Sequence, residues 1–391
     1  MDTAIASIKQ LASTATADER RQIIATLHDA AYSLEDSNDT IHRFGYLHLQ
    51  TAAVKIGFDL NLFKYLSEAG EPLNLEQIAQ ETGADKMFLG RYMSYLASVG
   101  TVKQVAKDQY AANNVTMNLT EKVAIAGISH WYFTIGPQYQ ELPAFLKRTS
   151  YRNPSDEMHT VSQDAWKTPL HHFAWLGTQP EKLGYFNDYM AFRREADLSW
   201  LSVYPVTEET KDWDPEKPVY VNIGGGIGHQ CAQFKEKYPN VHGRVILRDL
   251  PHSIEKALPT PGVENMVHNF FEPQPIKGRS QLLTSLPCAK FYFFRGVMHN
   301  HPDHKIRQIL LNTKAAMTPE SVILLDEWVL PESGVNAYAA SMDLTMMVAF
   351  AAMERSESHW REILADVGLK IVKTYRYNPV SYESVMDVRL A

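Results

Sequence analysis

Cysteine is scarce in this sequence of 391 residues, which contains only Cys231 and Cys288. Neither lies in a Cys-x-x-Cys or Cys/His spacing, so the sequence offers no disulfide framework and no structural zinc site, and we expect no bound metal. Such cysteine usage is typical of a protein from a reducing compartment.

An excess of basic charge is also missing. The chain has 38 Lys and Arg against 45 Asp and Glu, which gives a formal net charge of −7. Binding to nucleic acid or to an anionic membrane draws on positive charge, so we expect neither partner.

Uninterrupted apolar runs that could cross a bilayer, about 18 residues or more, are absent as well. The first residues, MDTAIASIKQLASTATADERRQ, contain no apolar core of signal-peptide length. We therefore expect a cytoplasmic protein. Hydrophobic residues make up 45% of the chain and charged residues 21%, which is ordinary for a globular protein, and the length predicts two or three domains.

The N-terminal third contains helical periodicity. Apolar residues recur at intervals of three and four over 3–33 and 47–66, which predicts helices with one buried face. Two shorter helices, 75–82 and 85–98, and two strands, 102–105 and 108–111, complete a winged-helix pattern, with Asn74 and Gln77 as a reciprocal helix cap. The would-be recognition helix carries only Lys86 and Arg91 as basic residues. We therefore expect a dimerisation or lid role here and not DNA binding.

Residues 121–200 are helical and rich in aromatic side chains, among them Trp131 and Phe186. Two interpretations stay open: packing of a core, and a concave pocket for an apolar, partly aromatic ligand. The polar, proline-containing segment 208–217 marks a change of pattern. The sequence thus predicts a helical winged-helix dimerisation domain at 1–120, a helical connector lining the substrate pocket at 121–210, and a third domain at 211–391.

The third domain alternates strands with helices. Strands are predicted at 219–223, 245–247, 267–270, 289–294 and 322–326. The internal ones are apolar, and helices separate most of the strands, as over 230–237 and 303–316. Such alternation is typical of an α/β, Rossmann-like parallel sheet with helices on both faces. Ligands of these folds bind at the carboxyl ends of the strands.

The first of these strands runs into a glycine-rich turn, Gly224-Gly225-Gly226-Ile227-Gly228. Glycines permit positive φ angles and let a ligand approach the backbone. Asp249 closes the second strand about 20 residues later, where a carboxylate can accept both hydroxyls of a ribose. Because the spacing departs from the dinucleotide pattern G-x-G-x-x-G, it favours S-adenosylmethionine as the cofactor.

Further motifs follow this turn: residues 244–251 read RVILRDLP, 268–271 read HNFF, 293–303 read FFRGVMHNHPD and 353–356 read MERS. With the glycine turn they make the chain resemble fungal O-methyltransferases of the plant caffeate-methyltransferase type, over nearly its whole length. The resemblance implies a class I methyltransferase domain, bound S-adenosylmethionine, a small-molecule substrate and a homodimer. It also implies these cofactor contacts: Gly224 and Gly226 to the methionine part, Asp249 beside Leu250 to the ribose, Asn269 and Phe270 to the adenine, and Arg295 to the polar end of the ligand.

The same resemblance places a catalytic base at His299 and two orienting acids at Glu327 and Glu354. The chemistry is reasonable on its own terms, because a neutral imidazole can accept a phenolic or enolic proton and a carboxylate fixes its tautomer. The structural alternatives are that His299 only packs at a strand end and that Glu354 is a solvated helix end.

Three residues depart from the family pattern around the cofactor: Asn222 and Asn269 stand in place of aspartates, and His301 in place of a tryptophan. One branch of the family, the leporin-type pericyclases, binds S-adenosylmethionine but catalyses dehydration and pericyclic ring closure without methyl transfer. His130 matches the pocket histidine of that branch. The departures favour a pericyclase that cyclises a polyketide or 2-pyridone alcohol by a hetero-Diels–Alder or Alder-ene reaction, with His299 and His130 hydrogen-bonding the substrate and Arg295 among the catalytic residues.

A genuine O-methyltransferase with His299 as general base is the alternative function, since His299, Glu327 and Glu354 would suffice for it. A winged-helix regulator that senses the cofactor is a third. The predicted residues of the substrate pocket are Trp131, Phe186, Met190, Met342 and Met346. The last two share one face of a predicted helix at 341–355, for which core or dimer packing is the competing interpretation.

Overall fold

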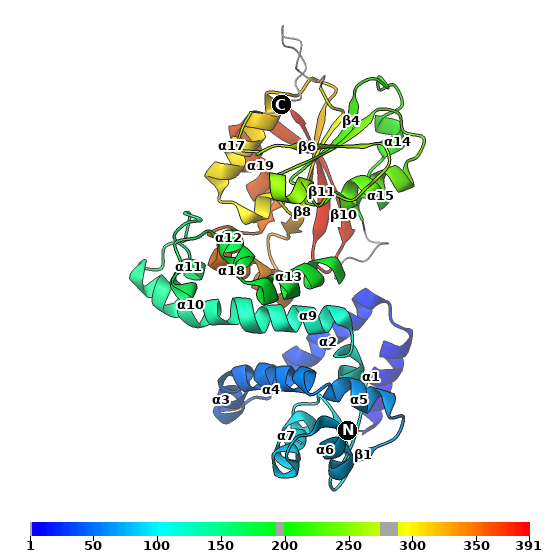
Figure 1. Ribbon diagram of the computed structural model, residues 1–391, viewed down its shortest axis with the longest axis vertical. Helices are drawn as coiled ribbons and strands as arrows, with labels where there is room; N and C mark the ends of the chain where they lie inside the picture. Colours follow the sequence, from blue (N-terminus) through cyan, green and yellow to red (C-terminus); the bar gives the residue numbers. More distant parts are fainter. Residues whose placement is uncertain (1, 193–198, 274–287) are drawn as a thin grey trace. The chain divides into compact units, whose positions relative to one another are not determined.

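The computed structural model describes residues 2–192, 199–273 and 288–391 (Figure 1). The chain forms two compact units: Met1–Pro137 with Leu176–Arg194, and Gln138–Trp175 with Glu195–Ala391. Residues of the connector predicted at 121–210 occur in both units, and the three-part division of the sequence stays a prediction. Within the described ranges, no helix combines the length and the apolar character needed to cross a membrane.

The first unit begins with helices in the predicted stretches: α1 (Asp2–Thr14), α2 (Ala17–Tyr32), α4 (Leu47–Asp59), α5 (Leu62–Glu68), α6 (Leu75–Thr82) and α7 (Lys86–Ser98). Helix α3 (Ser37–Gly45), between α2 and α4, was not predicted. A hairpin of β2 (Lys103–Ala106) and β3 (Gln109–Ala111) follows, and β3 also pairs with β1 (Leu73–Asn74). The predicted cap is confirmed, because Asn74 Oδ1 accepts the Gln77 N–H at 2.9 Å and Gln77 Oε1 accepts the Asn74 N–H at 2.8 Å. The winged-helix arrangement is present.

The remaining helices of the first unit are α8 (Asn114–Asn118), α9 (Lys122–His130), the π-helical turn η1 (Trp131–Ile135) and α13 (Pro180–Phe192). Helix α13 packs along α9. This close approach depends on Gly127, because a Cβ there would lie 2.9 Å from Cδ2 of Tyr189. The π-helical turn begins at Trp131, and such turns are frequent at functional sites.

In the second unit, α10 (Gly136–Arg148), α11 (Val161–Trp166) and α12 (His172–Gly177) precede the sheet and pack against α18 (Ala337–Phe350). Phe145, Val161 and Val348 form one apolar cluster there. The prediction of a helix at 341–355 was wrong at both ends. Asn336 caps the start of α18 with its side chain, and Ala351 ends the helix with a φ of +52°.

The sheet of the second unit has the strand order β10-β11-β8-β7-β4-β5-β6. Its strands are β4 (Pro218–Ile223), β5 (Arg244–Asp249), β6 (Val263–Val267), β7 (Phe291–Arg295), β8 (Val322–Leu330), β10 (Leu369–Asn378) and β11 (Glu383–Leu390), and β9 (Arg355–Ser356) pairs with β8. Strands β4 to β8 pair in parallel as predicted, whereas β10 and β11 are antiparallel, so the sheet is mixed and not wholly parallel. The strand predicted at 267–270 was also wrong, since β6 ends at Val267.

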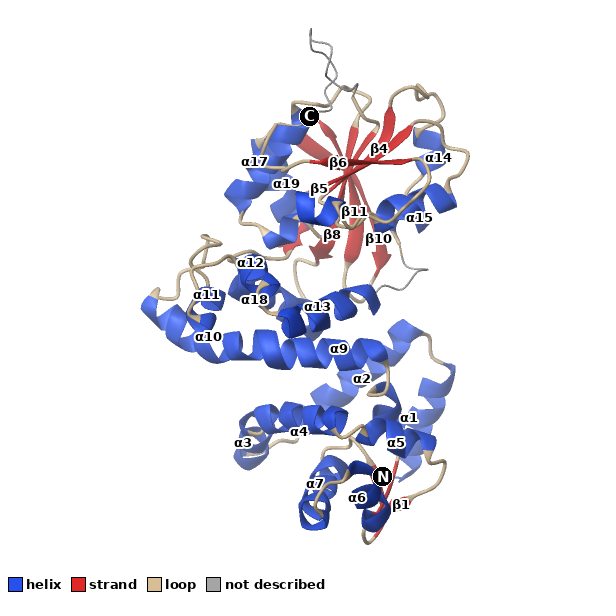
Figure 2. Ribbon diagram, in the orientation of Figure 1, coloured by secondary structure: helices blue, strands red, loops and turns tan. Residues whose placement is uncertain are grey.

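Helices cover both faces of this sheet (Figure 2). On one face, α17 (Asp303–Lys314) and α19 (Glu357–Asp366) pack on Ile323 and Leu325 of β8. On the other face, α15 (His229–Lys237) and η2 (Trp200–Ser202) contribute to a core with Leu324. Successive side chains of a strand point to opposite faces of the sheet. The neighbours Asp326 and Glu327 of β8 therefore lie on opposite faces at the carboxyl edge.

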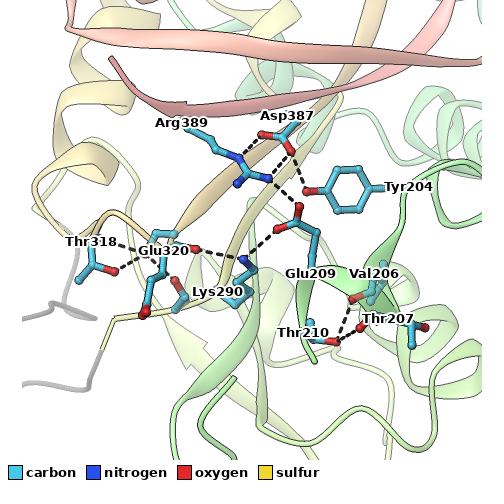
Figure 3. Close-up of polar contacts among 12 residues, drawn as sticks. Tyr204, Val206, Thr207, Glu209, Thr210, Lys290, Thr318, Glu320, Asp387 and Arg389 are labelled. Atoms are coloured by element: carbon cyan, nitrogen blue, oxygen red, sulfur yellow. Dashed lines mark hydrogen bonds and ion pairs between the residues drawn. The ribbon is translucent and has the colours of Figure 1, made fainter. Parts of the chain in front are cut away.

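A network of ion pairs lies at the opposite, amino edge of the parallel strands (Figure 3). Glu209, at the end of α14 (Val206–Glu209), accepts hydrogen bonds from Lys290 Nζ at 2.9 Å and from Arg389 Nη2 at 2.8 Å. Arg389 also donates to Asp387, which accepts the Tyr204 hydroxyl at 3.0 Å. The network ties the segment before β4 to the C-terminal strand β11.

Candidate functional site

The glycine turn after β4 is held against β5 by its own backbone. The N–H groups of Gly224 and Gly225 donate to the Arg248 carbonyl at 2.9 and 3.3 Å. Gly224 has a φ of +67° and Gly226 a φ of +61°. A Cβ at Gly224 would lie 2.9 Å from Val297 Cγ2, whereas a Cβ at Gly226 would meet nothing within 4 Å. The turn is therefore close-packed at Gly224 and open at Gly226.

Asp249 lies where the sequence predicts it, at the end of β5 and beside this turn. Its Oδ2 accepts the Gly226 N–H at 2.8 Å, and its Oδ1 accepts the Leu250 N–H at 2.7 Å. A carboxylate has about four acceptor positions, so each oxygen can accept a further hydroxyl hydrogen. The Leu250 side chain is exposed next to it.

Asn269 and Phe270 lie in the loop after β6. The Asn269 carboxamide accepts the Phe271 N–H at 3.1 Å, and α17 holds the backbone of this loop through Asn312 Nδ2, which donates to the Phe270 carbonyl at 3.2 Å. A Cβ at Gly224 would lie 3.5 Å from the Phe270 ring, so this ring borders the glycine turn. The glycine turn, Asp249 with Leu250, and Asn269 with Phe270 thus come together at one edge of the sheet.

Arg295, the last residue of β7, lies beside Asp326 of the neighbouring strand β8. Its Nε lies 3.4 Å from Asp326 Oδ2, and its Nη2 lies 3.8 Å from Glu383 Oε1. The Tyr377 hydroxyl donates to Asp326 Oδ1 at 2.7 Å. Burial raises the pKa of Asp326 to about 7, against the opposing effect of Arg295. The two acidic partners of Arg295 and the tyrosine that donates to Asp326 were not predicted, although Asp326 is the register partner of Arg295 in the parallel pair β7–β8.

On the opposite side of the sheet, His299 and Glu354 form a hydrogen-bonded pair. His299 lies in η3 (Met298–Asn300), and its Nδ1 is 2.8 Å from Glu354 Oε1. The Glu354 side chain is buried, whereas the His299 side chain keeps 21% of its surface exposed. The alternative in which Glu354 is a solvated helix end is therefore wrong.

Glu327 supports the same turn from β8. Its Oε1 accepts the N–H groups of Val297 at 3.1 Å and Met298 at 2.8 Å, the two residues before His299. Burial raises the pKa of Glu327. The sequence analysis did not predict Asp343 of α18, whose Oδ1 accepts the Glu354 N–H at 2.8 Å and so fixes the backbone of that acid.

The predicted residues of the first unit gather around His130. Its ring lies 5.4 Å from the Phe186 ring and 5.6 Å from the Trp131 ring, and Met190 follows Phe186 by one helical turn on α13. Burial lowers the pKa of His130 to about 4, so the imidazole is neutral at physiological pH. Its Nδ1 has no hydrogen-bond partner in the described part of the chain.

Met342 and Met346 lie one turn apart on α18 in the second unit, and both are buried. Nearby on α18, Thr345 shares a hydrogen bond of 2.5 Å with the Tyr139 hydroxyl of α10. The assignment of Met342 and Met346 to the substrate pocket stays a prediction.

Two of the three departures from the family pattern lie close to the predicted site residues. Asn222 is buried beneath the glycine turn, where a Cβ at Gly225 would lie 2.4 Å from its Nδ2. His301 follows η3, and its Nδ1 lies 3.3 Å from Glu157 Oε2 in the segment between α10 and α11. Glu157 was not predicted from the sequence.

The residues at this edge suit the nucleoside of S-adenosylmethionine. The open side of Gly226 leaves the backbone accessible, the Asp249 carboxylate presents acceptors to a ribose, and the Phe270 ring offers an apolar face to a base. The fold and this edge define an enzyme of the methyltransferase fold that uses S-adenosylmethionine.

Comparison with known proteins identifies the family. The family model of the O-methyltransferase domain matches residues 211–370, and the model of the O-methyltransferase dimerisation domain matches residues 44–122. O-methyltransferase ucdC of Aspergillus ustus is 37% identical over 361 residues, which cover 92% of each chain. The chain belongs to the O-methyltransferase family.

Two solved structures share the fold over the whole chain. LepI in complex with S-adenosylmethionine superimposes with a TM-score of 0.88 and 35% identity, covering 100% of this chain and 98% of that one. A protein described as a pericyclic reaction enzyme superimposes with a TM-score of 0.87 and 35% identity, covering 100% and 99%.

Proposed function

We propose that the enzyme is an O-methyltransferase that removes the proton of a phenolic or enolic hydroxyl with His299. The observation that carries this proposal is the 2.8 Å contact between His299 Nδ1 and the buried carboxylate of Glu354. A carboxylate that orients a histidine and stabilises its imidazolium form favours general-base catalysis.

The pair fixes the direction of proton transfer. With the Nδ1–H donating to Glu354, the Nε2 of His299 is the nitrogen that accepts the hydroxyl proton. The negative charge of Glu354 then stabilises the imidazolium that results. Glu327 keeps the turn in place through the N–H groups of Val297 and Met298, and Asp343 keeps Glu354 in place.

Bound S-adenosylmethionine supplies an electrophilic methyl group. We assign its binding to the residues predicted from the sequence: Gly224, Gly226, Asp249, Leu250, Asn269, Phe270 and Arg295. The contacts of Arg295 with Asp326 and Glu383 hold its guanidinium at the carboxyl edge of the sheet, where it would bind a carboxylate of the ligand. The substrate class we propose is a polyketide with an acidic hydroxyl.

The departures from the family pattern do not oppose methyl transfer. Asn222 lies below the glycine turn, the Asn269 carboxamide caps its own loop, and His301 pairs with Glu157. The contacts of Asn269 and His301 leave the acceptors of Asp249 and the pair of His299 and Glu354 unchanged.

A pericyclase is the second candidate, favoured by the likeness to a pericyclic reaction enzyme and by the state of His130. A buried, neutral imidazole with an unused Nδ1 can hydrogen-bond a carbonyl or hydroxyl of a 2-pyridone alcohol. Water would leave, a ring would close by hetero-Diels–Alder or Alder-ene reaction, and the cofactor would not be consumed.

Incubation with S-adenosylmethionine and a panel of phenolic, enolic and 2-pyridone substrates separates the two candidates. Methyl transfer produces one S-adenosylhomocysteine for each methylated product, measured by mass spectrometry. In that case His299→Asn, which keeps a donor toward Glu354 but has no base, should lower kcat by a factor of about 10² to 10⁴. The exposed His242→Asn is the matched control. Turnover to an isomerised or dehydrated product without S-adenosylhomocysteine would refute methyl transfer.

A further inference from the structure

A side-chain cluster beside the predicted adenine contacts has no part in the mechanism above. The His301 ring lies edge-on to two aromatic rings, 5.6 Å from Phe270 and 5.3 Å from Phe271. On its other side, His301 Nδ1 lies 3.3 Å from Glu157 Oε2. His301 therefore connects a wall of the predicted nucleotide site with the segment between α10 and α11.

Hydrogen bonds hold the backbone of the segment around Glu157 in place. Its carbonyl accepts a hydrogen bond from Gln163 Nε2 at 3.2 Å, and the same amide donates to the Leu170 carbonyl at 3.0 Å. Gln163 Oε1 accepts the Thr160 N–H at 2.8 Å. The carboxylate of Glu157 is thus carried by a segment whose position is set by several hydrogen bonds.

The surroundings of the Glu157 carboxylate are basic. His301 is the principal cause that lowers the pKa of Glu157, and Lys305 Nζ lies 3.8 Å from its Oε1. Lys305 also lies over the Phe271 ring, 4.9 Å from its centroid, and His171 is close enough to interact with both Glu157 and His301. The side chains of His301 and Glu157 keep only 12% and 18% of their surfaces exposed, so water screens their attraction weakly.

Helix α17 also holds the backbone of Phe270 and Phe271 in place. Helix α17 donates from Asn312 to the Phe270 carbonyl and from Gln308 to the Phe271 carbonyl, at 3.2 and 3.1 Å. The backbone of Phe270 and Phe271 is therefore anchored by α17, and His301 contacts both rings on the side of Glu157, while the apolar core of this face packs against them as well.

We propose that Glu157 is a positioning residue of the nucleotide site: it holds His301 against Phe270 and Phe271, and so keeps the Phe270 ring in place for the base of S-adenosylmethionine or S-adenosylhomocysteine. The inference rests on the proposed assignment of Phe270 to the adenine. It gives the segment between α10 and α11 a direct influence on cofactor affinity.

A double-mutant cycle tests this inference on the full-length, ligand-stripped protein, with S-adenosylhomocysteine titrated by calorimetry. Glu157→Ala removes the anchor, and His301→Phe keeps an edge-on ring but removes the Nδ1. Each single variant should weaken binding about fivefold or more. The double variant should bind no more weakly than the weaker-binding single variant, because both substitutions remove the same contact between Glu157 and His301. Under steady-state turnover, KM for S-adenosylmethionine should rise while kcat at saturating cofactor stays unchanged.

The neighbouring Asp156→Asn is the control for loss of negative charge in the same segment, and should bind as the wild type does. Melting temperatures of the ligand-free variants show whether each is folded, and the isosteric Glu157→Gln replaces Glu157→Ala if the latter unfolds. Additive effects of the two substitutions, or wild-type affinity in either single variant, would overturn the positioning role. Failure of the wild type to bind would overturn the assignment of the nucleotide site itself, which distinguishes the two proposals.

Discussion

At the scale of single residues, Glu354 sets the chemistry of the site, because it determines which nitrogen of His299 can accept a proton. Glu354→Gln keeps the size of the side chain but removes the charge that stabilises an imidazolium. We expect kcat for methyl transfer to fall about a hundredfold or more, with little change in cofactor affinity. Single-turnover assays measure the first quantity and calorimetry the second. The exposed Glu362→Gln is the control, and a change of less than threefold for Glu354→Gln would contradict the proposed pair.

His130 gives the first unit a defined pH dependence. Burial lowers the pKa of His130 to about 4, below the value of 6.5 for an accessible imidazole, so between these values the unfolded chain binds a proton that the folded chain does not. The stabilisation is complete above pH 6.5 and is lost as the pH falls toward 4. Between pH 7.5 and 5, the wild type should lose about 2 kcal/mol more unfolding free energy than His130→Gln, as measured by urea denaturation. Equal losses in both proteins would show that His130 is accessible to water.

The residues of the pair could be predicted from the sequence, whereas their supports could not. His299 and Glu354 belong to the motifs at 293–303 and 353–356, through which the chain resembles the O-methyltransferases, and that resemblance implied their roles. Asp343 and Glu157 are ordinary acidic residues of a helix and a connecting segment, and they gain their roles only from contacts with Glu354 and His301. Such contacts depend on how distant elements pack, which periodicity and spacing do not encode.

At the scale of elements, the glycine turn is limited by packing as well as by backbone conformation. Gly224→Ala would require a non-glycine residue at φ +67° and would place a Cβ 2.9 Å from Val297 Cγ2. Gly334 has a similar φ of +69° but open space around it, so Gly334→Ala isolates the cost of conformation. We expect Gly334→Ala to lower the free energy of unfolding by about 1 kcal/mol and Gly224→Ala by about 2 kcal/mol or more. Only Gly224→Ala should weaken binding of S-adenosylhomocysteine in calorimetry, and equal effects of both variants would contradict a packing role for Gly224.

The ion-pair network at the amino edge fastens α14 to β11 (Figure 3). Burial acts in the opposite direction, but Lys290 and Arg389 lower the pKa of Glu209 below its usual 4.5. The ionised carboxylate therefore stabilises the fold above pH 4.5, and this contribution is lost as the pH falls through the lowered pKa. Glu209→Gln should cost about 2 kcal/mol in urea denaturation at pH 7, whereas the exposed neighbour Glu208→Gln should cost almost nothing. The difference should shrink in acid, and a difference that stays constant with pH would refute the ionic origin.

Alternation of strands and helices predicted the parallel part of the sheet but not its antiparallel part. No helix lies between β10 and β11, which form a hairpin. A pattern of strands alternating with helices therefore does not predict these two strands. The error at β6 has a different origin. This edge strand includes Glu264 and Asn265, both exposed, and an edge strand does not require the continuous apolar run that identifies β4 or β7.

At the scale of the whole molecule, the N-terminal helices leave apolar surface uncovered. Among the described residues 2–45, neither α1 nor α3 buries a side chain. The exposed apolar side chains of this segment are Ile5, Leu11, Ile24, Leu27, Tyr32, Leu34, Ile41 and Phe44. Large apolar side chains exposed in this number along one segment are typical of an interaction surface. The O-methyltransferase dimerisation domain matches from residue 44 onward, so a second copy of the chain is the partner we infer.

This interface can be tested with the intact protein. Ile24 and Leu27 lie three residues apart on α2 and are 48% and 40% exposed, so both can contact the partner from one face of the helix. Introducing Ile24→Glu and Leu27→Glu together would place two charges in an apolar interface, which should convert a dimer into a monomer at micromolar concentration, observed by sedimentation velocity. Gln22→Glu adds a charge on another face of α2 and should leave the dimer intact. Because the substituted residues are exposed in the single chain, the melting temperature measured at low protein concentration should stay unchanged. A dimer that survives the double substitution would place the interface elsewhere in the first unit, and a wild type that sediments as a monomer would refute the homodimer.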